Sequence, residues 1–346
     1  MNMDKDTLLN IAQAACDAAI SNGAEFADVS AGYGSNLSVD LELSAIKSCD
    51  SRQGGGISVR AIYKGGTGWS SADRLTVDSA AEAGKKAAKL ARVAEPDPDF
   101  VALPAPAHQY PHVEGLADTR IAEMDIKKLI ECSLSNVDGA LAVCPEAVVQ
   151  GGFSARFGCS ALVNALGISL ADDGSYIGGH IMAVVRQGDD VGSFYDFDAA
   201  RVLDDFDPSA VGANAAKEAM KFLGARKIET KRMPVILGPL ASSSIFGAVV
   251  ANADAEGIQR SRSFMMNRLG KKIASDVVTI TDNPLIPRGL SSRGWDHEGV
   301  PSKPLVVVEN GVLKSYLYSS YTAGKAGVAS TGHGTRGGGA TPSNVN

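Results

Sequence analysis

The order of secondary-structure signals repeats within the first 223 residues, and this repeat limits the possible fold more than any other feature. The first copy has a helical pattern over 6–22, strand-like runs near 26–33, 37–47, 56–63 and 68–72, and a helical pattern over 76–93. The second copy has a helical pattern near 123–136, strand-like runs near 146–157, 160–171, 177–187 and 191–197, and a helical pattern near 208–223. Chance similarity of two α+β stretches is the alternative explanation.

Two segments in matching places support the repeat. ISVRAIYKGGTG, which begins at Ile57, and IMAVVRQGDDVG, which begins at Ile181, each combine an apolar strand with a glycine-bounded turn. We therefore predict an α+β fold. Its N-terminal domain, 1–223, is a duplicated helix–four-strand–helix unit (about 1–98 and 118–223) with mainly antiparallel sheet.

A second domain is predicted over 234–346, after a charged connector at 224–233. It opens with a short strand and a small-residue helix, and strand-like runs follow near 276–281, 304–309 and 312–318. Asn310-Gly311 gives the strongest hairpin signal in the chain, because both residues accept the positive φ angles of a type I′ turn. Beyond residue 325 no helical or strand periodicity remains, so we predict a β-rich domain that ends in loops.

Composition excludes several classes of function. The net charge is −6 and no basic patch follows the chain, so we expect no direct binding to nucleic acid. The five cysteines are scattered and form no C-x-x-C pair, which excludes a zinc ribbon. No apolar run has the length of a membrane span and no signal peptide is evident, so we expect a cytoplasmic protein. Glycine is frequent and aromatic residues make up 6%, which favours turns and close packing of small residues.

The segment WDHEGV contains the only His-Glu pair, His297-Glu298, and zinc peptidase motifs often begin this way. Such a motif needs a helix that carries a second histidine on the same face. Gly299, Val300 and Pro301 follow at once, and proline excludes that helix. We interpret the segment as a polar turn before a strand.

Several short motifs together resemble the TldD/PmbA family, whose members are also described as modulators of DNA gyrase or peptidase U62. In the second domain these are 261–264, 269–271, 280–284, 296–299, 305–317, 330–336, Pro342 and Asn344. In the first domain they are the stretches around Gly55, Arg60, Gly65 and Trp69. The family's peptidase branch carries His-Glu-x-x-x-His early in the second domain. Here those ligand and general-base positions hold Phe246, Gly247 and Ala251, whose side chains bind no zinc and accept no proton.

The resemblance implies the PmbA (TldE) branch, a non-catalytic subunit of a two-subunit zinc peptidase acting on unfolded peptides in a barrel-shaped chamber. We expect no metal or cofactor here, with zinc held by a TldD-like partner, and a homodimer is plausible for the isolated chain. Family members continue past the end of this chain, so we expect an incomplete, barrel-like second domain.

Two other functions remain open. One is an autonomous peptidase whose substrate-lining site combines Asp296, His297, Glu298 and His333. The other is a protein that modulates gyrase, or another protein, without proteolysis.

Overall fold

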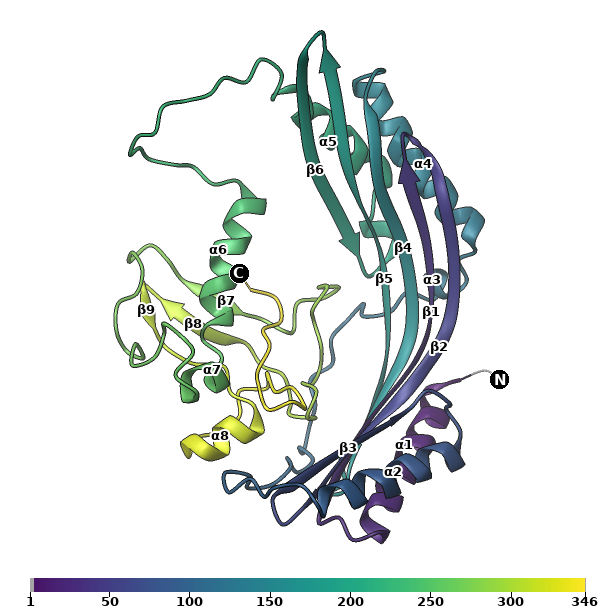
Figure 1. Ribbon diagram of the computed structural model, residues 1–346, viewed down its shortest axis with the longest axis vertical. Coiled ribbons are helices and arrows are strands. Elements are labelled where there is room, and N and C mark those ends of the chain that lie inside the picture. Colours follow the sequence, from purple (N-terminus) through teal and green to yellow (C-terminus); the bar gives the residue numbers. More distant parts are fainter. Residues whose placement is uncertain (1–2, 346) are drawn as a thin grey trace.

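The computed structural model describes residues 3–345 and contains one large curved sheet with helices on one face and a smaller lobe on the other (Figure 1). The six strands of the large sheet are β1 (Phe26–Glu42), β2 (Ala45–Tyr63), β3 (Gly66–Ala72), β4 (Val148–Asn164), β5 (Ser169–Gln187) and β6 (Asp190–Ala200). The helices of this part are α1 (Lys5–Ser21), α2 (Val77–Ala91), α3 (Thr119–Ala122), α4 (Ile126–Val143), η1 (Leu203–Asp205) and α5 (Pro208–Met220). All neighbouring strands of the sheet are antiparallel, as predicted.

The strand order β3-β2-β1-β4-β5-β6 shows the two copies side by side, joined along β1 and β4. Each copy has three long strands rather than the four shorter ones expected from the sequence. The expected break between 33 and 37 lies inside β1, and the expected break between 157 and 160 lies inside β4. The real turn of the first copy is at Leu43-Ser44, where both residues have positive φ. Leucine and serine are not residue types that favour such a turn, so the turn could not be predicted from the sequence.

Gly34 and Gly158 lie opposite each other where the two copies meet. A Cβ on Gly34 would lie 2.7 Å from the carbonyl oxygen of Phe157, and one on Gly158 would lie 2.7 Å from that of Tyr33. The clashes are reciprocal because the two glycines are directly paired in the antiparallel ladder of β1 and β4. Glycine is therefore needed at both positions for the central strands to approach closely.

Small residues also set the packing of the helices on the convex face. α1 and α2 cover one buried core and α4 and α5 cover a second, and the central strands β1 and β4 contribute residues to both. Gly84 of α2 would place a Cβ 2.1 Å from the carbonyl oxygen of Ala15, and Gly212 of α5 would place one 1.9 Å from that of Asn136. The glycine-rich composition thus produces the close packing that was predicted.

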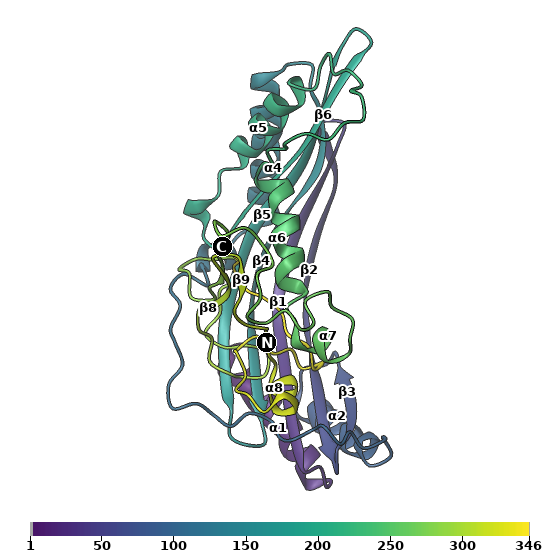
Figure 2. The ribbon, with the colours of Figure 1, turned by 90° about the vertical axis from the view of Figure 1, so that its left-hand side faces the viewer.

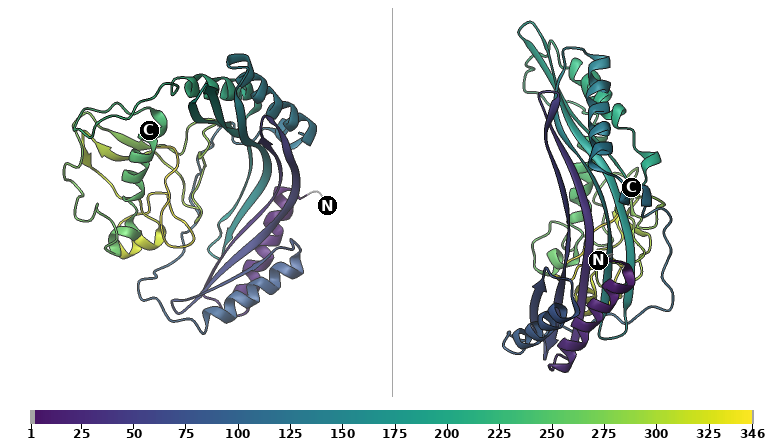
Figure 3. Two further views of the ribbon diagram at one scale, coloured as in Figure 1. Left: turned by 45° about the horizontal axis from the view of Figure 1, so that its top comes forward. Right: turned by 90° about the vertical axis from the view of Figure 1, so that its right-hand side faces the viewer.

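The C-terminal lobe follows an exposed connector and lies on the concave side of the large sheet (Figures 1 and 3). Its elements are α6 (Pro239–Ala251), α7 (Ala255–Gln259), β7 (Ile280–Asp282), β8 (Leu305–Glu309), β9 (Val312–Leu313) and α8 (Ser320–Ala326). The three strands form a separate antiparallel sheet, β7-β8-β9. The Asn310-Gly311 hairpin is confirmed, with φ of 49° and 75°.

The described part of this lobe contains no closed barrel, so a barrel-like domain is not confirmed. The strands of the lobe are shorter than predicted. Much of its backbone is hydrogen-bonded in turns or to side chains instead of to a neighbouring strand. The short strand expected at the start of the lobe is extended chain without ladder partners. No helix within residues 3–345 is long and apolar enough to cross a bilayer.

Replacement of Gly34 by alanine tests the junction of the two copies. The added Cβ meets backbone atoms that cannot move away without separating β1 from β4, so we expect the free energy of unfolding to fall by about 1–3 kcal/mol. Gly54 of β2 is the matched control, because a Cβ there meets nothing within 4 Å. Chemical denaturation should show a loss for Gly34→Ala and none for Gly54→Ala. Equal stability of the two variants would contradict the close approach.

Candidate functional site

Phe246, Gly247 and Ala251, which the family resemblance predicts to be degenerate metal-motif positions, lie on α6, a helix with almost no buried side chains. Val250 is its one buried residue, while Ile245 and Phe246 are 52% and 40% exposed. The apolar face of α6 that carries Ile245 and Phe246 is therefore mostly open. Phe246 and Gly247 line an apolar cavity of about 420 Å³ together with Val277 and Ile280.

This cavity does not fit a zinc ion. Zinc in proteins is held by sulfur, imidazole nitrogen or carboxylate oxygen. Phe246, Gly247 and Ala251 supply none of these, and the polar side chains lining the cavity are the hydroxyls of Ser242, Ser243 and Thr279. Across residues 3–345, no group of three or more His, Cys, Asp or Glu side chains could hold a metal ion.

Asp296 organises the turn at 296–300. Its carboxylate is buried and accepts hydrogen bonds from the backbone N–H groups of Glu298 (2.9 Å), Val300 (2.9 Å) and Gly334 (2.7 Å). The third of these bonds ties the turn to the glycine-rich segment 332–339. His297, between the two acids, has an exposed side chain. The segment is thus a polar turn, as the sequence indicated, and its first carboxylate is committed to backbone bonds.

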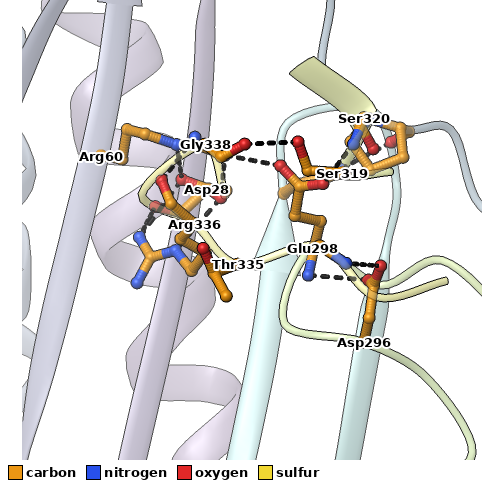
Figure 4. A network of polar contacts seen from close by, with 12 residues as sticks. Asp28, Arg60, Asp296, Glu298, Ser319, Ser320, Thr335, Arg336 and Gly338 are labelled. Carbon is orange, nitrogen blue, oxygen red and sulfur yellow. Dashed lines mark hydrogen bonds and ion pairs between the residues drawn. The ribbon is translucent and has the colours of Figure 1, made fainter. Parts of the chain in front are cut away.

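Glu298 is buried between the lobe and the large sheet (Figure 4). Its Oε2 accepts a 2.7 Å hydrogen bond from the backbone N–H of Ser320, and its Oε1 lies 3.8 Å from Arg60 Nη2. Burial raises the pKa of Glu298 to about 7, and the nearby charge of Asp296 adds to the rise, whereas Ser320 and Arg60 oppose it. Glu298 is therefore a buried carboxyl group that changes charge near neutral pH.

Two arginines enclose Asp28 of β1 beside this carboxyl group (Figure 4). Arg60 of β2 donates from Nε (3.0 Å) and Nη2 (2.8 Å) to the Asp28 carboxylate, and Arg336 of the glycine-rich segment donates from Nε (3.1 Å) and Nη2 (3.2 Å). Arg60 Nη1 also donates to the backbone oxygen of Arg336 at 2.8 Å. Burial opposes ionisation of Asp28, but the charges of Arg336 and Arg60 outweigh it, so its pKa is lowered.

Trp69 of β3 completes this cluster, which we call the arginine clamp (Asp28, Arg60, Trp69, Glu298 and Arg336). The guanidinium carbons of Arg60 and Arg336 lie 5.6 and 5.2 Å from the centre of its ring. A cavity of about 180 Å³ adjoins the clamp and is walled by Phe100 and Tyr321. The clamp joins β1, β2 and β3 to two loops of the C-terminal lobe.

His333 takes part in a different buried pair. Its Nε2 lies 2.7 Å from Oδ2 of Asp282 in β7, and its Nδ1 lies 3.0 Å from Oγ1 of Thr331. Ser343 donates its hydroxyl to Asp282 at 2.6 Å rather than to the imidazole, so the three residues do not form a nucleophile–base–acid relay. Burial opposes ionisation of Asp282, but hydrogen bonds from His333 and Ser343 outweigh it and lower its pKa.

The four candidate substrate-lining residues therefore divide into separate groups. Asp296 and Glu298 share one turn, His297 points to the surface, and His333 faces Asp282 with its side chain fully buried. Sequence reasoning did not identify Asp28, Arg60 and Arg336 as a unit. The sequence feature that could have indicated the cluster is a charged residue inside an apolar strand-like run: Asp28 in FADVSAGY and Arg60 in GISVRAIY.

Comparisons with known proteins agree along most of the chain. Three family models match: PmbA/TldA metallopeptidase domain 1 over 27–91, the central domain over 120–223 and the C-terminal domain over 230–346. Metalloprotease PmbA of Escherichia coli O157:H7 is 25% identical over 323 residues, which cover 90% of this chain and 70% of that one. The metalloprotease PmbA homolog of Haemophilus influenzae is 27% identical over 309 residues, which cover 86% and 67%.

Solved structures share the fold. TldE of Thermococcus kodakarensis superposes with a TM-score of 0.87 at 24% identity, covering 97% of this chain and 77% of that one. A proposed modulator of a DNA gyrase from Thermotoga maritima gives the same TM-score at 23% identity, covering 97% and 76%. The mixed α/β fold with a mainly antiparallel sheet is therefore common to these proteins and this chain.

Replacement of Glu298 by glutamine tests the buried carboxyl group. Because its folded pKa of about 7 lies above the ordinary value of 4.5, the folded state holds a proton that the unfolded state releases between these pH values. The contribution of Glu298 to stability is thus fully present below pH 4.5 and is lost as the pH rises through 7. The loss is on the order of 3 kcal/mol.

We expect Glu298→Gln to be close to the wild type at pH 5 and more stable than it at pH 8, measured by urea denaturation. Glu309→Gln is the matched control, because Glu309 is half exposed and pairs with Lys314 at the surface. A difference between Glu298→Gln and wild type that does not change with pH would show that Glu298 stays ionised throughout.

Proposed function

Because this chain belongs to the PmbA/TldD metallopeptidase family, we propose that it is a non-catalytic, PmbA/TldE-like subunit of a peptidase whose zinc is held by a TldD-like relative. Its role in this proposal is to complete the surface on which an unfolded peptide is held while the partner cleaves it. No cofactor of its own is required for that role.

One observation carries the proposal: α6 has phenylalanine, glycine and alanine where the peptidase branch needs two imidazoles and a carboxylate. Neighbouring hydroxyl groups do not replace these ligands, because zinc sites in proteins are built from stronger donors. The alternative of an autonomous peptidase based on Asp296, His297, Glu298 and His333 finds no support in the geometry. The Asp296 carboxylate is occupied by backbone donors, and the His333 side chain is sealed from solvent.

The surface around α6 fits a protein partner. Val277 is 87% exposed and lines the same cavity as Phe246, which is 40% exposed. Ile236, in the connector just before α6, is 99% exposed. Contiguous exposed apolar side chains usually mark an interaction site, since water solvates them poorly. The placement of this surface beside the degenerate motif is what a subunit would need if it met its zinc-bearing relative there.

Mixing experiments test this function. The purified chain should hold no stoichiometric zinc by mass spectrometry of metals and should not cleave an unfolded peptide. Cleavage should appear, or rise well above the level of the partner alone, when a TldD-like relative from the same genome is added. Stoichiometric zinc together with cleavage by this chain alone would refute the proposal.

A charge within the exposed surface tests the site of contact. Val277→Asp should weaken association with the TldD-like partner at least about tenfold in a titration, because it places a carboxylate in an apolar interface. Val93→Asp is the control, since Val93 is 81% exposed and lies just beyond α2 on the helical side of the large sheet. Equal weakening by both variants would place the contact elsewhere.

A further inference from the structure

The concave face of the large sheet carries an exposed aromatic group at the end away from the arginine clamp. Residues of β5 that pack under the helices, such as Ile181 and Ala183, alternate with His180 and Met182, which therefore point to the other face. Tyr195 and Phe197 of β6 lie beside them and are 43% and 51% exposed. Ring centres are 5.9 Å apart for His180 and Tyr195, and 6.1 Å apart for Tyr195 and Phe197.

The register of the strands places an acid in the same row. Asp40 of β1 pairs with Gly152 of β4, Gly152 pairs with His180, and His180 pairs with Phe197. A Cβ on Gly152 would lie 3.3 Å from Oδ1 of Asp40 and 3.5 Å from Cε1 of His180. The carboxylate and the imidazole thus stand on either side of a hollow that exists because residue 152 has no side chain.

Asp40 and His180, the two side chains that flank this hollow, also line an open cavity of about 370 Å³. Its lining combines carboxylates on one side with a thioether and an imidazole on the other: Asp40, Glu42, Lys47, Gln150, His180 and Met182 contribute side chains. Figure 2 shows the far ends of β5 and β6 extending beyond α6. The exposure of His180, Tyr195 and Phe197 shows that this part of the face is open to solvent.

Asp40 has a free charge, whereas the basic groups on the same face are engaged. Its Oδ2 accepts the Ser48 hydroxyl at 2.7 Å, and no ion pair within the described residues includes it. Lys47 pairs with Glu42 at 3.1 Å and Arg52 pairs with Asp50 at 2.5 Å. Arg156, further along the face, bonds to Asn36 and stacks on Tyr176. The hollow therefore offers an unneutralised carboxylate beside aromatic rings.

We propose that this surface (Asp40, Gly152, His180, Tyr195 and Phe197) binds a segment of unfolded peptide in which a basic side chain neighbours aromatic or aliphatic ones. The basic group would lie over Gly152, between the Asp40 carboxylate and the rings, and the apolar side chains would cover Tyr195 and Phe197. A carboxylate attracts a cation through charge, and aromatic faces attract it through their quadrupole. The inference rests on the proposed function and deepens it by naming a substrate class.

The geometry suits an extended chain. Gly152 and Phe197 are two strands apart, which corresponds to about 10 Å across the sheet. Long side chains a few residues apart on an extended peptide reach over this distance, since each residue advances by about 3.3 Å. Acidic peptides would meet an unpaired carboxylate, and peptides without apolar side chains would leave the rings uncovered.

Direct binding to the isolated chain tests the proposal without a need for cleavage. The probes are three dye-labelled peptides of twelve residues each: one alternates Lys with Phe, one alternates Glu with Phe, and one alternates Lys with Ser. Binding of each peptide is measured by fluorescence anisotropy. We expect the Lys–Phe peptide to bind at least about tenfold more tightly than the other two. The Glu–Phe peptide lacks the positive charge, and the Lys–Ser peptide lacks the apolar contact.

Two variants separate the contributions. Asp40→Asn should weaken binding of the Lys–Phe peptide about threefold to tenfold and reduce its dependence on salt, because a charge is removed. Phe197→Ser should weaken binding by a similar factor and leave the salt dependence unchanged. The controls are Glu131→Gln on α4 and Leu90→Ser on α2, which alter exposed side chains on the helical side of the sheet.

Equal affinity for the three peptides, or affinities that the two concave-face variants leave unchanged, would overturn the inference. Circular dichroism of each variant establishes that an altered affinity does not come from unfolding. Zinc bound to the chain together with cleavage by it would refute the proposed function, whereas the peptide series would still report on this surface.

Discussion

The contact on which the structure depends is the ionised Asp28 carboxylate held between two guanidinium groups. Asp28 and Arg60 come from neighbouring strands of the large sheet, and Arg336 comes from a loop of the lobe more than 270 residues away from Arg60. Removal of one partner from such a buried group leaves charges uncompensated, which costs several kcal/mol. Charge-assisted hydrogen bonds also have narrow geometry. The clamp therefore sets where the lobe lies on the concave face.

The character of this junction differs from that of the two cores. Under the helices, alanine and glycine allow backbones to approach closely, and the buried side chains are apolar. The lobe has a third apolar cluster of its own, around Val307 and Leu317, that does not merge with the other two. Its attachment to the large sheet instead uses the arginine clamp and polar contacts such as Arg201 with the backbone of Gly289 and Leu290. Gly299 of the lobe also packs on Leu162 and Ile168 of the large-sheet part, so directed polar bonds and some apolar packing together orient the lobe.

This difference explains how much the sequence could predict. The long helices of the first domain, the mainly antiparallel sheet and the Asn310-Gly311 hairpin follow from local periodicity and turn chemistry and were predicted, whereas the short helices α3, α7 and α8 were not. Strand ends were not, because Gly34 and Gly158 suggest turns when read locally and are instead a close contact between distant strands. The degenerate motif at Phe246, Gly247 and Ala251 stays a prediction from the family resemblance. The clamp was not predicted, since it depends on a loop meeting a strand across the fold.

The concave face combines these separate elements into one functional surface. The same alternation that buries Val29, Val39 and Ile181 under the helices turns Asp28, Arg60, Asp40 and His180 to the opposite side. The arginine clamp occupies one end of the concave face, and the other end stays exposed to solvent. Glu298 lies in the clamp with a pKa of about 7, so its charge near neutral pH depends on the surroundings that the lobe provides. A lobe held by directed polar bonds keeps the open end at a defined distance from α6, which a lobe attached by apolar contacts alone would not guarantee.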